Sequence, residues 1–123
     1  MNLGYRTFEP MSAQKEHTIA ILGLGYVGLP LAVAFSKKYK TLGFDINAEK
    51  VNLIASGIDP TNELVGDQLS HALQSHLQIT TDSALLSSCN TFIITVPTDI
   101  HPDNSPNLEP LIAASNLVGE YLK

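Results

Sequence analysis

The chain has 123 residues, of which 44% are hydrophobic and 15% charged, and its formal net charge is −5. This length suits one domain with its own core, and the negative charge offers no attraction to nucleic acid or to an anionic membrane surface. No apolar run reaches the ~20 residues that a transmembrane helix needs. We therefore expect neither nucleic acid nor a membrane as a partner. The single cysteine, Cys89, excludes an internal disulfide and fits a cytoplasmic location.

The first predicted elements are a strand and a helix. Residues 1–17 are mostly polar, lack periodicity and have no long apolar core, so we expect an N-terminal extension there and the folded domain over residues 18–123. The apolar run at 18–22 predicts a buried strand. A helix is predicted from about Tyr26 to Tyr39, and its apolar positions are Val27, Leu31, Ala34 and Phe35.

Three glycines separate this strand from the helix. Gly23, Gly25 and Gly28 have the spacing G-x-G-x-x-G, which in a strand–turn–helix context predicts a dinucleotide-binding site. In that pattern Gly23 allows a tight turn, Gly25 lets the backbone approach a pyrophosphate, and Gly28 lets the helix pack close to the strand. Free N–H groups at the helix start, at the positive end of its dipole, would bind the phosphates.

The second predicted strand, at 40–44, ends at an acidic residue. Asp45 follows the glycines by about 20 residues, where a carboxylate accepts hydrogen bonds from the adenosine ribose hydroxyls. NAD is the expected cofactor, because the 2′-phosphate of NADP would meet a like charge and no arginine lies beside Asp45. Taken alone, Asp45 could instead be an ordinary cap of the next helix.

The rest of the chain alternates helices and strands. A helix at 48–56 has Val51, Ile54 and Ala55 facing inward. The run at 91–96 is nearly all apolar, which predicts a strand buried on both faces, and Cys89 before it is expected to be a small buried hydrophobe. The other predicted elements are a helix at 67–76, a strand at 77–80, a helical turn capped by Asp82 through Leu86, and a helix from Pro110 to Lys123.

This alternation predicts an α/β fold, with a Rossmann-type parallel sheet, right-handed crossovers and helices on both faces. Four strands in the order 3-2-1-4 correspond to such a sheet truncated after its first half, as in a piece of a longer enzyme. The ligand then lies at the carboxyl ends of the strands, between the first and the fourth. This places the glycine turn, Asp45 and the corner Pro97-Thr98 around one crevice.

The histidines and the acidic loop residues do not predict a metal site. His71 and His76 are five residues apart and so do not share one helix face. Asp99, His101 and Asp103 lie in a proline-rich loop, where solvated side chains are the rule. We expect no metal.

Four segments of the chain match a known pattern. They are Gly23–Ala32, Gly43–Val51, Val96–Thr98 and Ser105–Leu111. Together they resemble the nucleotide-sugar 6-dehydrogenases, typified by UDP-glucose and UDP-N-acetylhexosamine dehydrogenases, over about residues 18–123. The sequence departs from the family pattern at Asp99, which replaces a proline, and at Asn107, which replaces an aspartate.

The resemblance implies the NAD-binding domain of an oxidoreductase that oxidises the C6 alcohol of a UDP-sugar to a uronate for polysaccharide biosynthesis, using two NAD in succession. The expected partners are NAD and, in a full-length homodimer, the UDP-sugar. By resemblance, NAD contacts fall on Val27, Asp45, Lys50 and Thr98. The complete candidate cofactor site is Gly23, Gly25, Tyr26, Val27, Gly28, Asp45, Lys50, Pro97 and Thr98.

The resemblance places the catalytic residues and the sugar-binding domain beyond this chain. Cys89 does not match the context of the family's catalytic cysteine, so the chain alone is expected to be inactive. Pro30 and the segment 57–63 resemble the N-acetylhexosamine branch more than the glucose branch. Two other functions stay open: a non-catalytic nucleotide-sensing module, and the NAD-binding domain of a 3-hydroxy acid dehydrogenase. Lys50 likewise has an alternative, as a solvated helix lysine.

Overall fold

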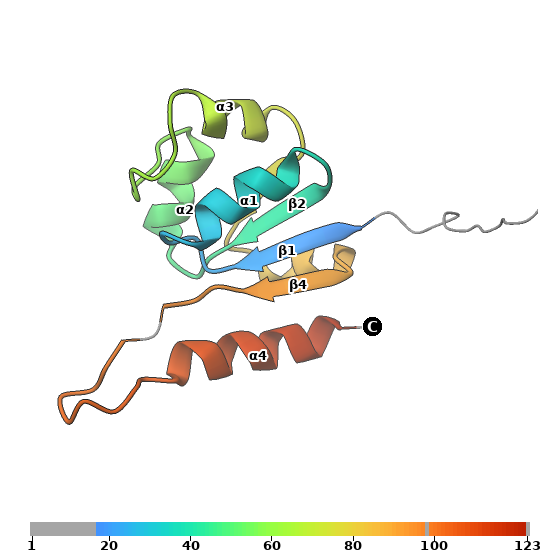
Figure 1. Cartoon of the computed structure of the whole chain (residues 1–123). Helices are drawn as coiled ribbons and strands as arrows, with labels where there is room; N and C mark the ends of the chain where they lie inside the picture. The colour runs from blue at the N-terminus through green and yellow to red at the C-terminus, as the bar shows by residue number, and fades with distance from the viewer. Residues whose placement is uncertain (1–16, 98, 123) are drawn as a thin grey trace, which may run out of the picture.

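A four-stranded parallel sheet lies between two layers of helices in the computed structural model, which describes residues 17–97 and 99–122 (Figure 1). The strand order β3-β2-β1-β4 confirms the predicted 3-2-1-4 order and the α/β class. The elements are β1 (Thr18–Leu22), α1 (Gly28–Ser36), β2 (Lys40–Phe44), α2 (Ala48–Ala55), α3 (Gln68–Leu73), β3 (Leu77–Thr80), the 3-10 helix η2 (Ser83–Ser88), β4 (Thr91–Ile94) and α4 (Glu109–Tyr121).

The register of the sheet determines which residues meet at its carboxyl edge. Leu22 at the end of β1 lies opposite Phe44 of β2 on one side and Ile94 of β4 on the other. All pairs are parallel, so the chain leaves these three strands at the same edge. The segments that follow the three strands are therefore neighbours in space, although they are far apart in the sequence.

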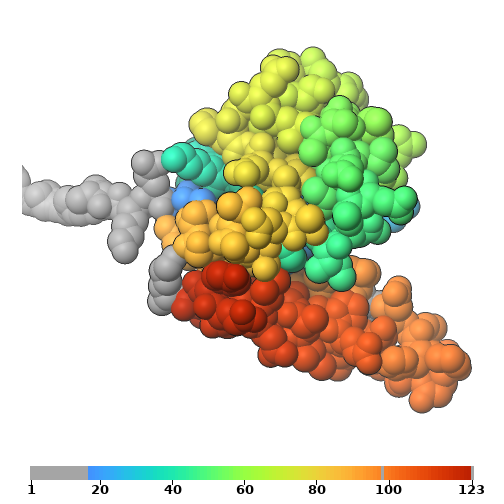
Figure 2. All heavy atoms as spheres, turned by 180° about the vertical axis from the view of Figure 1, so that it is seen from behind, coloured from blue at the N-terminus to red at the C-terminus, as the bar shows by residue number. Residues whose placement is uncertain are grey.

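Each face of the sheet has its own apolar cluster. Helices α1, α2 and α3 cover one face, where Ile21, Leu29 and Ile54 are fully buried (Figure 1). The 3-10 helix η2 and helix α4 pack on the other face, and in the view from behind their atoms (gold and red) adjoin on the surface (Figure 2). Cys89, 1% exposed, lies in this second cluster with Leu86, which confirms that it is a small buried hydrophobe.

The buried face of α1 differs from the predicted one. Val27 and Ala34 are exposed, and Leu31 and Phe35 are only half-buried. The cause is at the start of the helix, where Gly28 packs directly on the turn after β1 and thereby determines the rotation of α1 about its axis. The residues that turn inward are Gly28, Leu29, Ala32, Val33 and Ser36.

Strand β4 is shorter and more exposed than predicted. It ends at Ile94, and its residues are half-buried rather than buried on both faces. It pairs with β1 on one side, and no strand within residues 17–97 and 99–122 pairs with its other side.

Two predictions for the short helices have different outcomes. Ala55 of α2 is exposed instead of facing inward. Asp82 caps η2 as predicted, because its carboxylate accepts the Ala84 N–H at 3.0 Å.

The loop between α2 and α3 is organised by Asp59. Its carboxylate accepts the hydroxyl of Thr61 at 2.6 Å and the backbone N–H of Leu64 at 2.9 Å. Burial raises the pKa of the Asp59 carboxyl, but the hydrogen bonds from Thr61, Leu64 and Glu63 outweigh it and hold that pKa below its usual value. The ionised carboxylate is therefore the form that holds this loop.

Two of the side chains considered for metal binding have ordinary hydrogen-bond partners. His71 lies 3.1 Å from the Asp67 carboxylate, and Asp103 accepts the Ser105 hydroxyl, which lowers the pKa of Asp103. Among the described residues, no three His, Cys, Asp or Glu side chains come together as a metal-binding group. None of the helices in this part of the chain has the length and apolarity needed to span a membrane.

Candidate dinucleotide-binding site

The glycine turn begins where β1 ends. Gly23 has a φ of +103°, a conformation that L side chains rarely adopt, and a Cβ here would lie 2.8 Å from the Thr95 carbonyl oxygen. Its N–H donates to the Phe44 carbonyl at 2.8 Å, which ties the turn to β2. Only glycine fits here without displacing the backbone of the segment after β4.

The other two glycines differ in the space around them, which is filled at Gly28 and open at Gly25. A Cβ on Gly28 would lie 1.7 Å from the Gly23 carbonyl oxygen and 2.5 Å from the Thr95 hydroxyl oxygen. A Cβ on Gly25 would meet no atom within 4 Å. Gly28 therefore permits the close packing of α1 on the turn. The space beside Gly25 is open, as the approach of a pyrophosphate to this backbone requires.

Three backbone donors follow Gly25 directly in the turn. The N–H groups of Tyr26, Val27 and Gly28 have no hydrogen-bond acceptor among the described residues. Val27 is the N-cap of α1, and its side chain makes no capping hydrogen bond. Unpaired N–H groups at the positive end of a helix dipole are a suitable site for an anion. The side chains of Tyr26 and Val27 are 70% and 66% exposed, so they lie on the surface around the turn.

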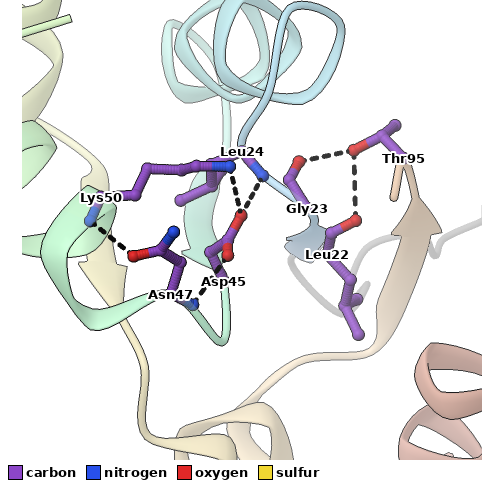
Figure 3. Close-up of polar contacts among 7 residues, drawn as sticks. All are labelled: Leu22, Gly23, Leu24, Asp45, Asn47, Lys50 and Thr95. Atoms are coloured by element: carbon purple, nitrogen blue, oxygen red, sulfur yellow. Dashed lines mark hydrogen bonds and ion pairs between the residues drawn. The ribbon is translucent and has the colours of Figure 1, made fainter. Parts of the chain in front are cut away.

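Asp45 connects β2 to the glycine turn (Figure 3). It is 8% exposed; its Oδ2 accepts the Leu24 N–H at 2.8 Å and its Oδ1 accepts the Asn47 N–H at 2.9 Å. The helix cap is Asn47, whose Oδ1 accepts the Lys50 N–H at 3.1 Å, so the alternative that Asp45 caps α2 is wrong. A carboxylate has about four acceptor positions, and Lys50 Nζ also donates to Oδ2 at 3.4 Å, so Asp45 can still accept one further donor such as a ribose hydroxyl.

Lys50 lies beside this carboxylate. Its Nζ is 3.4 Å from Asp45 Oδ2, and its side chain is 30% exposed. Lys50 is thus partnered rather than a freely solvated helix lysine, and its ammonium group lies at the edge of the candidate site.

An exposed apolar side chain also adjoins Asp45. Ile46 follows it directly in the chain and is 85% exposed, and no sequence motif singles it out.

Thr95 also contacts the glycine turn, although no sequence motif singles it out. Its hydroxyl donates to the Gly23 carbonyl at 2.7 Å and also lies 3.2 Å from the Leu22 carbonyl oxygen (Figure 3). Its backbone N–H donates to the Leu22 carbonyl at 2.8 Å. The parallel register was the available signal, because a residue that follows β4 must adjoin the turn that follows β1. Pro97 is exposed two residues further on, and Thr98 lies outside the described residues.

Known proteins place this geometry in a family. Residues 17–123 match the UDP-glucose/GDP-mannose dehydrogenase family, NAD binding domain. The chain is 46% identical over 109 residues to UDP-N-acetyl-D-glucosamine 6-dehydrogenase of Pseudomonas aeruginosa, covering 89% of this chain and 25% of that protein. It is 38% identical to UDP-N-acetyl-D-mannosamine dehydrogenase of Campylobacter jejuni, covering 85% of this chain and 26% of that protein.

Solved structures agree with the sequence relatives. A UDP-D-ManNAc dehydrogenase from Pyrococcus horikoshii superposes with a TM-score of 0.76 at 35% identity, over 85% of this chain and 26% of that one. A GDP-mannose dehydrogenase from Pseudomonas aeruginosa, solved as a ternary complex, gives a TM-score of 0.73 at 27% identity, over 82% and 24%.

The chain spans about a quarter of the length of the relatives that it matches. The matched region is the part with the glycine turn, Asp45 and the parallel sheet, and the family match sets aside the 3-hydroxy acid dehydrogenase alternative. The chain belongs to the UDP-glucose/GDP-mannose dehydrogenase family and is its NAD-binding domain.

Proposed function

We propose that this chain supplies the NAD site of a UDP-N-acetylhexosamine 6-dehydrogenase, an enzyme that oxidises the C6 alcohol of the sugar to a carboxylate. The observation that carries the substrate is the similarity, at 46% and 44% identity, to two relatives named UDP-N-acetyl-D-glucosamine 6-dehydrogenase. The full-length enzyme would contain a sugar-binding domain and the catalytic residues, would act as a cytoplasmic homodimer, and would provide uronates for polysaccharide biosynthesis.

In this proposal each part of the site binds one part of NAD. The open space at Gly25 and the N–H groups of Tyr26, Val27 and Gly28 take the pyrophosphate. The free acceptor capacity of Asp45 takes the adenosine ribose. The positive charge of Lys50 and the corner Pro97-Thr98 complete the site. Bound NAD supplies the hydride acceptor for the oxidation.

We expect the chain to bind NAD more tightly than NADP, by about 5- to 150-fold. The 2′-phosphate of NADP would face the Asp45 carboxylate, and repulsion in a partly solvated site is worth on the order of 1–3 kcal/mol. The measurement is a calorimetric titration of the chain with each cofactor. Tighter binding of NADP would contradict the role given to Asp45.

Lys50 provides a control for this preference. Its ammonium, 3.4 Å from Asp45 Oδ2, partly offsets the carboxylate charge. Lys50→Met should therefore increase the preference for NAD over NADP. Lys37 is an exposed lysine at the C-terminal end of α1, far from the glycine turn, so Lys37→Met should leave this preference unchanged. A smaller preference for NAD over NADP in the Lys50 variant would count against the electrostatic explanation.

The substrate is tested on the full-length protein. The substrates to compare, with NAD present, are UDP-glucose, UDP-N-acetylglucosamine, UDP-N-acetylgalactosamine and UDP-N-acetylmannosamine. We expect at least one of the three UDP-N-acetylhexosamines to have a higher kcat/KM than UDP-glucose. The 123-residue chain should give no steady NADH production with any of them. A clear preference for UDP-glucose would contradict the proposed substrate. NAD binding without turnover of any sugar by the full-length protein would instead favour the nucleotide-sensing module.

A further inference from the structure

One peptide group of the glycine turn is held from both sides by side chains of other strands. The Gly23 carbonyl accepts the Thr95 hydroxyl at 2.7 Å, and the N–H of the same peptide, on Leu24, donates to Asp45 Oδ2 at 2.8 Å. Thr95 follows β4 and Asp45 follows β2, so the two side chains approach from opposite sides of β1 (Figure 3). We call these two hydrogen bonds the Thr95–Asp45 clamp.

We propose that Thr95 is a positioning residue for cofactor binding, which acts through the Gly23–Leu24 peptide. This inference rests on the proposed NAD site. The carbonyl and N–H of a peptide group point in opposite directions because the group is planar and trans. Fixing the carbonyl toward Thr95 therefore fixes the Leu24 N–H toward Asp45, and with it the path of the chain into the turn.

The surroundings of the Gly23 carbonyl make this hydroxyl important. The oxygen occupies the space where a Cβ of Gly28 would lie, 1.7 Å away, so it is packed against the start of α1. Rotation of the peptide would move this oxygen and shift the turn that carries the N–H groups of Tyr26 and Val27, which have no acceptor among the described residues. It would also remove the Leu24 N–H from the carboxylate that is expected to bind ribose. The hydroxyl of Thr95 thus preorganises both halves of the cofactor site.

The test compares Thr95→Ala with Thr95→Ser in the 123-residue chain. Both variants lose the γ-methyl group, so they differ only in the hydroxyl. We expect Thr95→Ala to bind NAD about tenfold more weakly than Thr95→Ser, the factor that one hydrogen bond of ordinary net strength produces, and Thr95→Ser to approach the wild-type affinity. Equal affinities of the two variants would overturn the inference while leaving the NAD site of the wild type intact.

Thr41 is the matched control. It is 3% exposed and its hydroxyl also donates to a backbone carbonyl, that of Tyr39 at 3.0 Å, but it lies at the amino end of β2, away from the turn. Thr41→Ala and Thr41→Ser should bind NAD equally well, even where the alanine variant is less stable. If Thr41→Ala weakened NAD binding as much as Thr95→Ala does, general destabilisation would explain both and the inference would be wrong.

A second measurement needs no cofactor. Hydrogen exchange of the Leu24 amide should be slow in the wild type and in Thr95→Ser, because this N–H donates to Asp45, and at least about tenfold faster in Thr95→Ala. A Leu24 amide that exchanges at the rate of an unprotected amide in the wild type would refute the clamp. If the wild type showed this protection but bound no NAD, the proposed NAD site would fail while the clamp would stand.

Discussion

Gly25→Val is expected to abolish NAD binding and to leave the folded structure essentially unchanged. A Cβ at this position meets no protein atom within 4 Å, and Gly25 lacks the positive φ that would strain another residue. The Cβ of the added side chain therefore meets open space, and the side chain occupies the space assigned to the pyrophosphate. We expect the Kd for NAD to rise by at least about a hundredfold, or ~2.7 kcal/mol, with the melting temperature within a few degrees of the wild type.

The measurements are calorimetric titration with NAD and thermal unfolding followed by circular dichroism. Gly25→Ala serves as a graded variant, because its single methyl group fills less of the space and should weaken binding less than valine does. Gly119→Val adds the same side chain in open space on α4, outside the site, and should not change the Kd. An unchanged NAD affinity in Gly25→Val would mean that the glycine pattern serves only as a structural turn.

Gly28→Ala is expected to have the opposite outcome, a loss of stability of the whole fold rather than of one cofactor contact. Its Cβ would lie 1.7 Å from the Gly23 carbonyl oxygen, a backbone atom that Thr95 holds in place. Relief requires α1 to move away from β1, which separates Leu29 and Ala32 from the core beneath them. Overpacking of this kind costs about 3 kcal/mol or more, which lowers the melting temperature of such a domain by roughly 10 °C or more.

Gly119→Ala is the matched control for this substitution. Gly119 lies inside α4, and a Cβ there meets no atom within 4 Å. Alanine is a better helix former than glycine by about 1 kcal/mol, so this variant should be as stable as the wild type or more stable. A Gly28→Ala variant that melts at the wild-type temperature would show that α1 does not need the close contact with the turn.

The sequence by itself determined the elements of the sheet and the centre of the candidate site. Apolar runs identified all four strands, and the Rossmann-type topology predicted from the glycine pattern then supplied the strand order that the structure confirms. The glycine spacing and the acidic residue after the second strand identified Gly23, Gly25, Gly28 and Asp45. These features are readable because each depends on a short segment of chain, or on a topology with few alternatives.

Only the tertiary structure decided how these segments contact one another. The rotation of α1 depends on the contact between Gly28 and the turn, and the half-burial of β4 depends on its place at the edge of the described sheet. The role of Thr95 depends on a contact with a residue 72 positions away, and that of Asp45 on one 21 positions away. No local pattern encodes such contacts, because their geometry is fixed only when the strands pair and the helix packs against them.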